Sequence, residues 1–256
     1  MSEVKPSLTL LSRPTFDVEA VSHWLRASGL AWRRTPNATP AEELIELAGR
    51  ICYMSFGSRQ SPRDNAQYIR NLVMQGHESV LEHASWTFMI EGVSRSFSHQ
   101  FVRHRAGFSF SQLSQQYADQ SSMPARLPVA ISRSEELRRV WSRAIESAHE
   151  AYEAILRNLE NQSLPGDPEE ERERRRAIRS AARSVLPEAT ETMIVFSANA
   201  RALRYFLDVR GGIVGDEEMR LVAAELHEVL IAEAPAVFSD FEVVSVGGLP
   251  LVMRKA

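Results

Sequence analysis

Arginine, imidazole, hydroxyl and amide side chains crowd into one short stretch near the middle of the chain. It contains Arg103, His104 and Arg105, followed by a Ser- and Gln-rich run from Ser109 to Gln116. Guanidinium groups bind phosphate oxygens in a bidentate fashion, and hydroxyls with nearby backbone N–H groups complete an anion site. The composition therefore indicates a nucleotide phosphate site. Arginines that are solvated or paired with acidic neighbours remain the alternative.

A second polar group lies upstream, where His77, Glu82 and His83 come close together in the sequence. Such sets suggest a metal, but the spacing differs from that of the His-Glu-x-x-His zinc helix. Hydrogen-bonded structural histidines are the alternative, and we predict no metal site. Farther along stand residues that, each taken alone, are typical of a surface position: Arg183, Asn199, Arg201 and Arg210.

The chain has a single cysteine, Cys52. One cysteine excludes an intramolecular disulfide and a cysteine-based zinc cluster. Because Cys52 lies in the apolar run from Arg50 to Tyr53, we expect a thiol packed in the core rather than a catalytic nucleophile.

Helices with clear start signals precede the chemistry-bearing stretch. Thr39 as N-cap, Pro40 and a capping-box Glu42 predict a helix from about 40 to 53. The pair Ser61-Pro62 predicts the start of a second helix, which Gly76 ends.

Two predicted strands each lead into a helix. Residues 86–90 form the first, and Ser94 begins a helix that carries Arg103, His104 and Arg105 at its C-terminal end. Since adjacent helical positions point about 100° apart, these three side chains would serve two surfaces. We expect His104, as a residue of a terminal turn, to contribute little to the core. Residues 192–196 form the second strand, and Asn199 caps the helix after it.

Long helices complete the pattern. An amphipathic helix spans about 134–160, with Leu137 and Val140 in its apolar stripe, and another begins at Pro168. The charge run from Glu169 to Arg176 is typical of a solvated helix face, and a final helix occupies about 216–233. Without repeats or a linker-like stretch, the sequence predicts one α+β domain over residues 1–256.

The bulk composition limits the partners. The chain has 256 residues, of which 44% are hydrophobic and 25% charged, so it can bury a real core. It contains no run of apolar residues long enough to span a membrane, and its first residues lack a secretory signal, so we expect a cytoplasmic protein without a membrane partner. A net charge of −3 argues against broad nucleic-acid binding.

Taken together, the motifs resemble those of the flavin-dependent thymidylate synthases. That family's hallmark is Arg-His-Arg followed after seven or eight residues by serine, present here as Arg103–Arg105 and, after eight residues, Ser114. The resemblance extends to Gly-His-x-Ser/Thr-x-x-Glu-His at 76–83, and to Leu-Pro ahead of Asn-Ala-Arg at 186–187 and 199–201. It covers about residues 40–235.

The resemblance implies a helix-flanked antiparallel sheet assembled into a homotetramer, with active sites built from several subunits. It also implies roles for individual residues. FAD contacts would come from Ser79, Glu82, Arg103, His104, Arg105, Asn199 and Arg201. Nucleotide contacts would come from Gln100, Gln112, Ser114, Gln115, Gln116, Arg183 and Arg210. Catalytic roles would fall to His77 beside the flavin ring, to Ser114, and to Arg210 against negative charge on the uracil ring.

The implied reaction is methylation of dUMP at carbon 5, with NADPH as reductant, 5,10-methylenetetrahydrofolate as carbon donor and no protein nucleophile. Some residues depart from the family pattern. Gln116 replaces a substrate-contacting arginine, and Tyr205 and Val214 stand where many relatives have Asn or His. A UMP or mixed UMP/dUMP methylase is therefore the nearest alternative, and a non-catalytic nucleotide- or RNA-binding protein is a weaker one.

Overall fold

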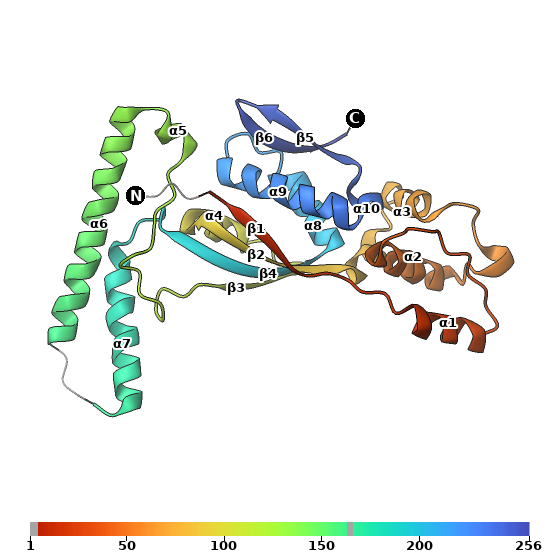
Figure 1. Ribbon diagram of the computed structural model, residues 1–256, viewed down its shortest axis with the longest axis horizontal. Helices are drawn as coiled ribbons and strands as arrows, with labels where there is room; N and C mark the ends of the chain where they lie inside the picture. Colours follow the sequence, from red (N-terminus) through yellow and green to blue (C-terminus); the bar gives the residue numbers. More distant parts are fainter. Residues whose placement is uncertain (1–4, 163–165, 256) are drawn as a thin grey trace. The chain divides into compact units, whose positions relative to one another are not determined.

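The computed structural model describes residues 5–162 and 166–255. It is a mixed α+β structure with a four-stranded antiparallel sheet, in the order β1-β2-β4-β3, and a two-stranded sheet of β5 and β6 (Figure 1). The strands are β1 (Ser7–Ser12), β2 (Ser85–Ser94), β3 (Phe108–Gln112), β4 (Glu191–Asn199), β5 (Phe241–Val246) and β6 (Leu249–Arg254). The helices are α1 (Val18–Ala27), α2 (Pro40–Tyr53), α3 (Asn65–Met74), α4 (Arg95–Phe101), α5 (Val129–Ser132), α6 (Glu135–Asn161), α7 (Pro168–Ala182), α8 (Ala200–Arg210), α9 (Glu217–Glu233) and α10 (Pro235–Phe238), with short 3-10 helices η1 (Gly57–Arg59), η2 (Glu78–His83) and η3 (Arg183–Val185).

The residues group into two compact units, and neither is a continuous piece of the chain. The first contains residues 5–7, Ile90–Arg103 and Ser111–Ile194. The second contains Leu8–Met89, His104–Phe110 and residues 195–255. Within the described ranges, no helix combines the length and the apolar character needed to cross a membrane.

In the second unit, α2 and α3 begin at side-chain caps. Thr39 and Glu42 form the predicted capping box of α2, with the Glu42 carboxylate accepting from the Thr39 N–H at 2.9 Å. The predicted start of α3 at Ser61 is wrong, because Asp64 caps the helix by accepting from the Gln67 N–H at 2.7 Å. Asp and Ser are about equally good N-caps, but the Ser61 hydroxyl accepts from the Arg63 N–H at 3.3 Å in the turn before the helix. Gly76 ends the segment with φ +70°, as predicted.

The last turn of α2 overturns the expectation for Cys52. Buried positions on α2 end at Arg50, whose guanidinium contacts Glu46 and lies 4.7 Å from the Tyr68 ring centroid. Cys52 and its neighbours Ile51 and Tyr53 are exposed. The three residues after Arg50 therefore lie on the surface, because no other side chain of the described residues covers them.

The two predicted strand-to-helix junctions are confirmed. The Ser94 hydroxyl accepts from the Phe97 N–H at 3.0 Å and starts α4, and the Asn199 side chain accepts from the Ala202 N–H at 2.9 Å and starts α8. In both cases the final residue of a strand is the N-cap of the next helix. The short connection leaves little freedom in how each helix leaves its strand.

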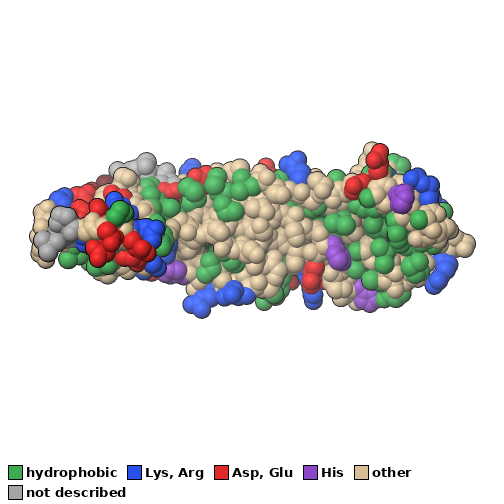
Figure 2. All heavy atoms as spheres, turned by 90° about the horizontal axis from the view of Figure 1, so that it is seen from below, with side chains coloured by type: hydrophobic (Ala, Val, Ile, Leu, Met, Phe, Trp, Pro, Cys, Tyr) green, Lys and Arg blue, Asp and Glu red, His purple; other side chains and the backbone are tan. Residues whose placement is uncertain are grey.

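In the first unit, α6 and α7 lie side by side (Figure 1) around a core of Tyr152, Leu156, Ile178 and Ala182. Both helices were predicted. The N-terminal end of the α6 stripe is not covered in this chain, since Leu137 and Val140 are about half exposed. Acidic and basic side chains gather over this pair of helices (Figure 2). Ion pairs along α7, such as Arg175 with Glu171 at 3.7 Å, confirm the solvated charge run.

The C-terminal segment contains structure that periodicity did not predict. Strands β5 and β6 form an antiparallel hairpin that packs on α9 (Figure 1), with the pair Val243 and Val252 in its register. The final helix, predicted over about 216–233, is confirmed as α9 with Asp216 as its N-cap. Strands β1 and β3 and helix α1 were also not predicted.

Candidate functional site

Helix α8 brings two of the predicted motifs together in the second unit. From its first turn, Arg201 reaches η2, where its guanidinium lies 2.6 Å from the Glu82 carboxylate and 4.0 Å from that of Glu78. Arg201 and Glu82 are each about half exposed. An exposed guanidinium held by a carboxylate is positioned to bind an anionic ligand.

The base of this arrangement is a buried arginine that the sequence did not single out. Arg204 on α8 lies 3.9 Å from Glu78 and makes a two-pronged ion pair with Asp240 at 2.6 and 2.7 Å. Burial opposes ionisation of Asp240, but the hydrogen bonds and charge of Arg204 outweigh it and lower its pKa. The buried Arg204 therefore fixes η2 against α8 through its contact with Glu78, whereas Arg201 stays at the surface.

The Arg-His-Arg motif follows helix α4 rather than ending it. The helix stops at Phe101, and residues 103–105 lie in the turn before β3. The expectation of helical geometry for these three residues is wrong, but their side chains still diverge. Arg103, in the first unit, and Arg105, in the second, are exposed, whereas His104 is buried.

His104 is held by the far end of α8. Its ring centroid lies 5.3 Å from that of Phe206, 5.9 Å from Phe108 and 6.1 Å from Tyr205. Arg210 Nε donates to His104 Nε2 at 3.2 Å. Burial lowers the pKa of His104, and the Arg210 charge lowers it further, so the imidazole is a neutral acceptor. The expectation that His104 lies outside the core is wrong, because these aromatic rings enclose it.

A close backbone approach fixes the turn against the start of α8. Gly107 has φ +75°, and a Cβ there would lie 2.7 Å from Asn199 Nδ2 and 2.8 Å from Ala202 Cβ. The Asn199 N–H donates to the Gly107 carbonyl at 3.2 Å. Only glycine fits this approach, and Asn199 therefore both caps α8 and orders the turn.

The remaining candidates of this unit lie on η2. His77 stands at its N-cap position without a side-chain hydrogen bond to the cap, and both His77 and Ser79 are exposed. Within residues 5–162 and 166–255, no group of three or more His, Cys, Asp or Glu side chains could hold a metal.

The predicted nucleotide residues belong mainly to the first unit. Gln112 Nε2 donates to Ser98 Oγ at 2.8 Å and to Thr192 Oγ1 at 3.1 Å, which fixes the amide at the end of β3. The Ser114 hydroxyl accepts from the Gln116 N–H at 3.3 Å, and Gln115 is buried. Gln100 is exposed on α4.

A cationic pair near these residues includes one arginine that the sequence analysis missed. Arg95, the first residue of α4, donates to the Leu113 carbonyl at 3.4 Å. Its pKa is lowered by burial and by the positive charge of Arg183, and Glu188 partly opposes this. Two guanidinium groups that repel each other favour an anion between them. In the sequence, only its place directly after the N-cap Ser94 marks Arg95.

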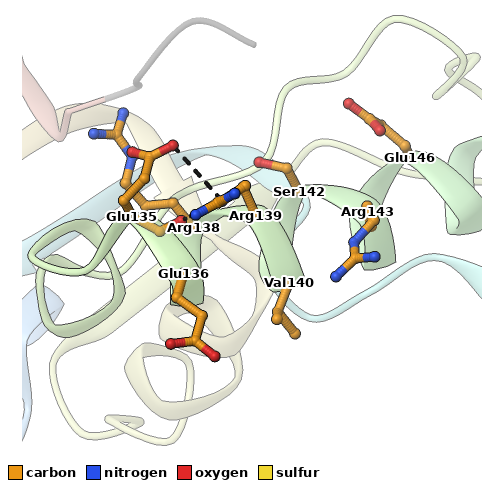
Figure 3. A pocket seen from close by; sticks show the side chains of 8 residues that line it. All are labelled: Glu135, Glu136, Arg138, Arg139, Val140, Ser142, Arg143 and Glu146. Atoms are coloured by element: carbon orange, nitrogen blue, oxygen red, sulfur yellow. Dashed lines mark hydrogen bonds and ion pairs between the residues drawn. The ribbon is translucent and has the colours of Figure 1, made fainter.

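A hollow of about 930 Å³ lies along the first half of α6 and contains none of the predicted residues (Figure 3). All the side chains that line it come from this one helix. They carry charges of both signs, and the ion pair drawn there, Glu135 with Arg139, is 4.0 Å long and largely exposed. This hollow is an open surface of α6 rather than an enclosed site.

Comparison with known proteins identifies the family. Residues 36–236 match the family model described as thymidylate synthase complementing protein. The chain is 40% identical over 248 residues to a flavin-dependent thymidylate synthase of Mycobacterium sp. (strain JLS), covering 95% of this chain and 93% of the relative. It is 42% identical over 226 residues to the protein of the same name from Mycobacterium marinum and 41% identical over 226 residues to that of Mycobacterium tuberculosis. Each of these two matches covers 88% of this chain.

The chain belongs to the flavin-dependent thymidylate synthase family. The resemblance drawn from the three motifs is thereby confirmed.

For a flavin-dependent thymidylate synthase, the geometry sorts the predicted residues into two groups. In the second unit, contacts with α8 connect Glu82 to Arg201, His104 to Arg210, and the Gly107 turn to Asn199. In the first unit, Gln112, Ser114, Gln116 and Arg183 lie on or after β3 and at the end of α7. The charges fit anionic ligands in both units, since each presents at least one partly exposed guanidinium beside hydrogen-bonding side chains.

Proposed function

We propose that this member of the flavin-dependent thymidylate synthase family methylates dUMP at carbon 5 to give dTMP. The proposal includes FAD as the redox cofactor, 5,10-methylenetetrahydrofolate as the carbon donor and NADPH as the reductant. The observation that carries it is helix α8, which holds a surface cation, Arg201, near its start and a second cation, Arg210, at its end, each bonded to a residue of a different family motif.

The residues near the start of α8 fit a flavin dinucleotide. Arg201, Ser79 and Arg105 present a guanidinium, a hydroxyl and a second guanidinium at the surface of the unit, which suits a diphosphate. Asn199 and Gly107 keep the neighbouring turn rigid. The chemistry that bound FAD supplies is hydride transfer, so the protein needs no nucleophile of its own.

Arg210 is the residue that we propose to stabilise negative charge on the uracil ring. Its Nε is committed to His104, and a neutral imidazole accepts this bond without cancelling the positive charge of the guanidinium. A cation held in a fixed orientation needs little reorganisation when charge develops on the substrate. His104 would then act through Arg210 as a positioning residue, in addition to any contact with flavin. His77 and Ser114 remain proposed at the flavin ring and at the nucleotide.

One observation favours UMP as a second substrate. The guanidinium expected after Ser114-Gln115 is absent, and the Gln116 amide is bound to helix α7. We expect a changed contact at this point to alter tolerance of the ribose. We keep dUMP as the principal substrate.

The wider assembly is also a proposal. Because both units take segments from several parts of the chain, we propose that residues 1–256 act as one domain. We further propose a cytoplasmic homotetramer. Half-exposed apolar side chains on several helices support an oligomer, including Leu137 and Val140 on α6 and Tyr205 on α8. Its mass in solution should be four times the chain mass of 28.8 kDa.

The test of the function begins with the purified protein. It should be yellow or quench the fluorescence of added FAD, and it should form dTMP from dUMP only when NADPH and methylenetetrahydrofolate are both present. Turnover on UMP, measured alongside, separates the two substrates. A colourless protein that does not quench FAD fluorescence would overturn the proposal. Arg210→Gln should bind FAD but lose most of its turnover, by about a hundredfold or more if a fixed cation is removed.

A further inference from the structure

The side chain of Gln116 is bound on both sides by helix α7. Its amide Nε2 donates to Ser180 Oγ at 3.4 Å, and its Oε1 accepts from Arg176 Nε at 3.3 Å. The next residue is held by the same helix, since Arg179 Nη1 donates to the Tyr117 carbonyl at 2.6 Å and the Arg176 guanidinium lies 5.6 Å from the Tyr117 ring centroid. The segment after Ser114 is thus fixed against one face of α7.

That face of α7 is a basic stripe. Arg176, Arg179 and Arg183 follow each other at spacings of three and four residues, which places them on one side of the helix and of the turn that continues it. Arg176 has an acidic partner, Glu173 at 3.6 Å, but both side chains are about half exposed and such a pair is weak. At the end of the stripe, Arg183 adds its charge to that of Arg95.

We propose that Arg176 binds the phosphate of the nucleotide substrate and that Gln116 is the residue that positions it. The identity of the nucleotide rests on the proposed function. An arginine at position 116 would face Arg176 and Arg179 with like charge, whereas an amide oxygen accepts from Arg176 and holds it beside Ser114. The positive charge lost at position 116 is therefore supplied from α7.

The first experiment measures binding to the FAD-loaded protein by calorimetry, with dUMP and with deoxyuridine as the probe that lacks the phosphate. Arg176→Gln should weaken dUMP binding about tenfold to hundredfold, the usual effect of losing a charged hydrogen bond, and leave deoxyuridine binding unchanged. Arg175→Gln is the matched control, because Arg175 is an exposed neighbour on the same helix that pairs only with Glu171 at 3.7 Å among the described contacts. It should bind both ligands as the wild type does.

The second experiment moves the positive charge from position 176 to position 116. Gln116→Ala should raise KM for dUMP with little change in kcat, whereas the double variant Gln116→Arg with Arg176→Gln should recover most of the dUMP affinity that Arg176→Gln loses. Melting temperatures of all variants should stay within a few degrees of the wild type. A structural role would instead lower the melting temperature and weaken dUMP and deoxyuridine alike, and that result would overturn the assignment. Wild-type dUMP affinity in Arg176→Gln would overturn this assignment alone, whereas a wild-type protein that binds neither FAD nor dUMP would overturn the proposed function.

Discussion

Replacing His104 by alanine should destabilise the protein as well as disturb its flavin chemistry. The imidazole is enclosed by Phe108, Tyr205 and Phe206, so its removal leaves a hole in an aromatic cluster. Truncating a buried Phe or Trp to Ala costs about 3–5 kcal/mol, and the smaller imidazole should cost about 2–3 kcal/mol. The lost hydrogen bond to Arg210 adds little, because Arg210 is only partly buried and water can replace His104.

This loss of unfolding free energy should be measurable as a lower melting temperature. For a chain of this size, 1 kcal/mol lowers the melting temperature by about 2–4 °C, so His104→Ala should melt about 4–12 °C below the wild type in a thermal scan of the FAD-free protein. His104→Gln keeps an acceptor for Arg210 and more of the volume, and should lose about half as much. Arg105→Ala is the control, since this exposed neighbour should change stability by about 0.5 kcal/mol or less. An unchanged melting temperature in His104→Ala would refute the buried arrangement around α8.

Three further predictions concern pH, backbone and thiol. Burial and the charge of Arg210 lower the pKa of His104 in the folded state. As pH falls below about 6.5, His104 is therefore protonated in the unfolded chain before it is protonated in the folded protein. The free energy of unfolding should decline between pH 6.5 and the folded pKa, and it should decline more steeply in the wild type than in His104→Gln. His227, whose pKa burial also lowers, contributes equally to both proteins, so equal slopes would contradict this role of His104. Gly107→Ala should lower the free energy of unfolding by about 2 kcal/mol, because the added Cβ stands at a positive φ and displaces Asn199. Gly247 also has a positive φ, but nothing lies within 4 Å of an added Cβ, so Gly247→Ala should lower it by about 1 kcal/mol. Equal losses, measured by thermal unfolding, would exclude the close approach at Gly107. Cys52 should react with a thiol reagent in the folded protein, and Cys52→Ala should keep full turnover. An unreactive thiol would contradict the exposed position of Cys52, and an inactive variant that still binds flavin would contradict the mechanism without a protein nucleophile.

Contacts between residues close in the chain were the part of the fold that sequence predicted best. Thr39, Ser94 and Asn199 cap helices as expected, because an N-cap side chain and the N–H that it binds are only two or three residues apart. The start of α3 shows the limit of this approach. Two nearby residues, Ser61 and Asp64, can both cap a helix, and only the folded structure shows that Asp64 does so.

Packing decided what periodicity left open. The run around Cys52 is apolar, yet Ile51, Cys52 and Tyr53 are exposed because no other described part of the chain covers them. His104 is polar, yet it is buried because its ring packs against Phe108, Tyr205 and Phe206. The burial of a side chain depends on what other elements bring to it, and that information is absent from a window of ten residues.

The sequence by itself determined the family and the order of its motifs, and it predicted most of the residues that we propose to meet an anionic ligand, since these depend on residue type and short spacing. Tertiary structure alone decided which of these residues contact one another. Arg210 meets His104 across 106 positions, and Arg176 meets Gln116 across 60. Such contacts form only when packed helices and strands fix both backbones, because the chain between them places no direct limit on where either side chain lies.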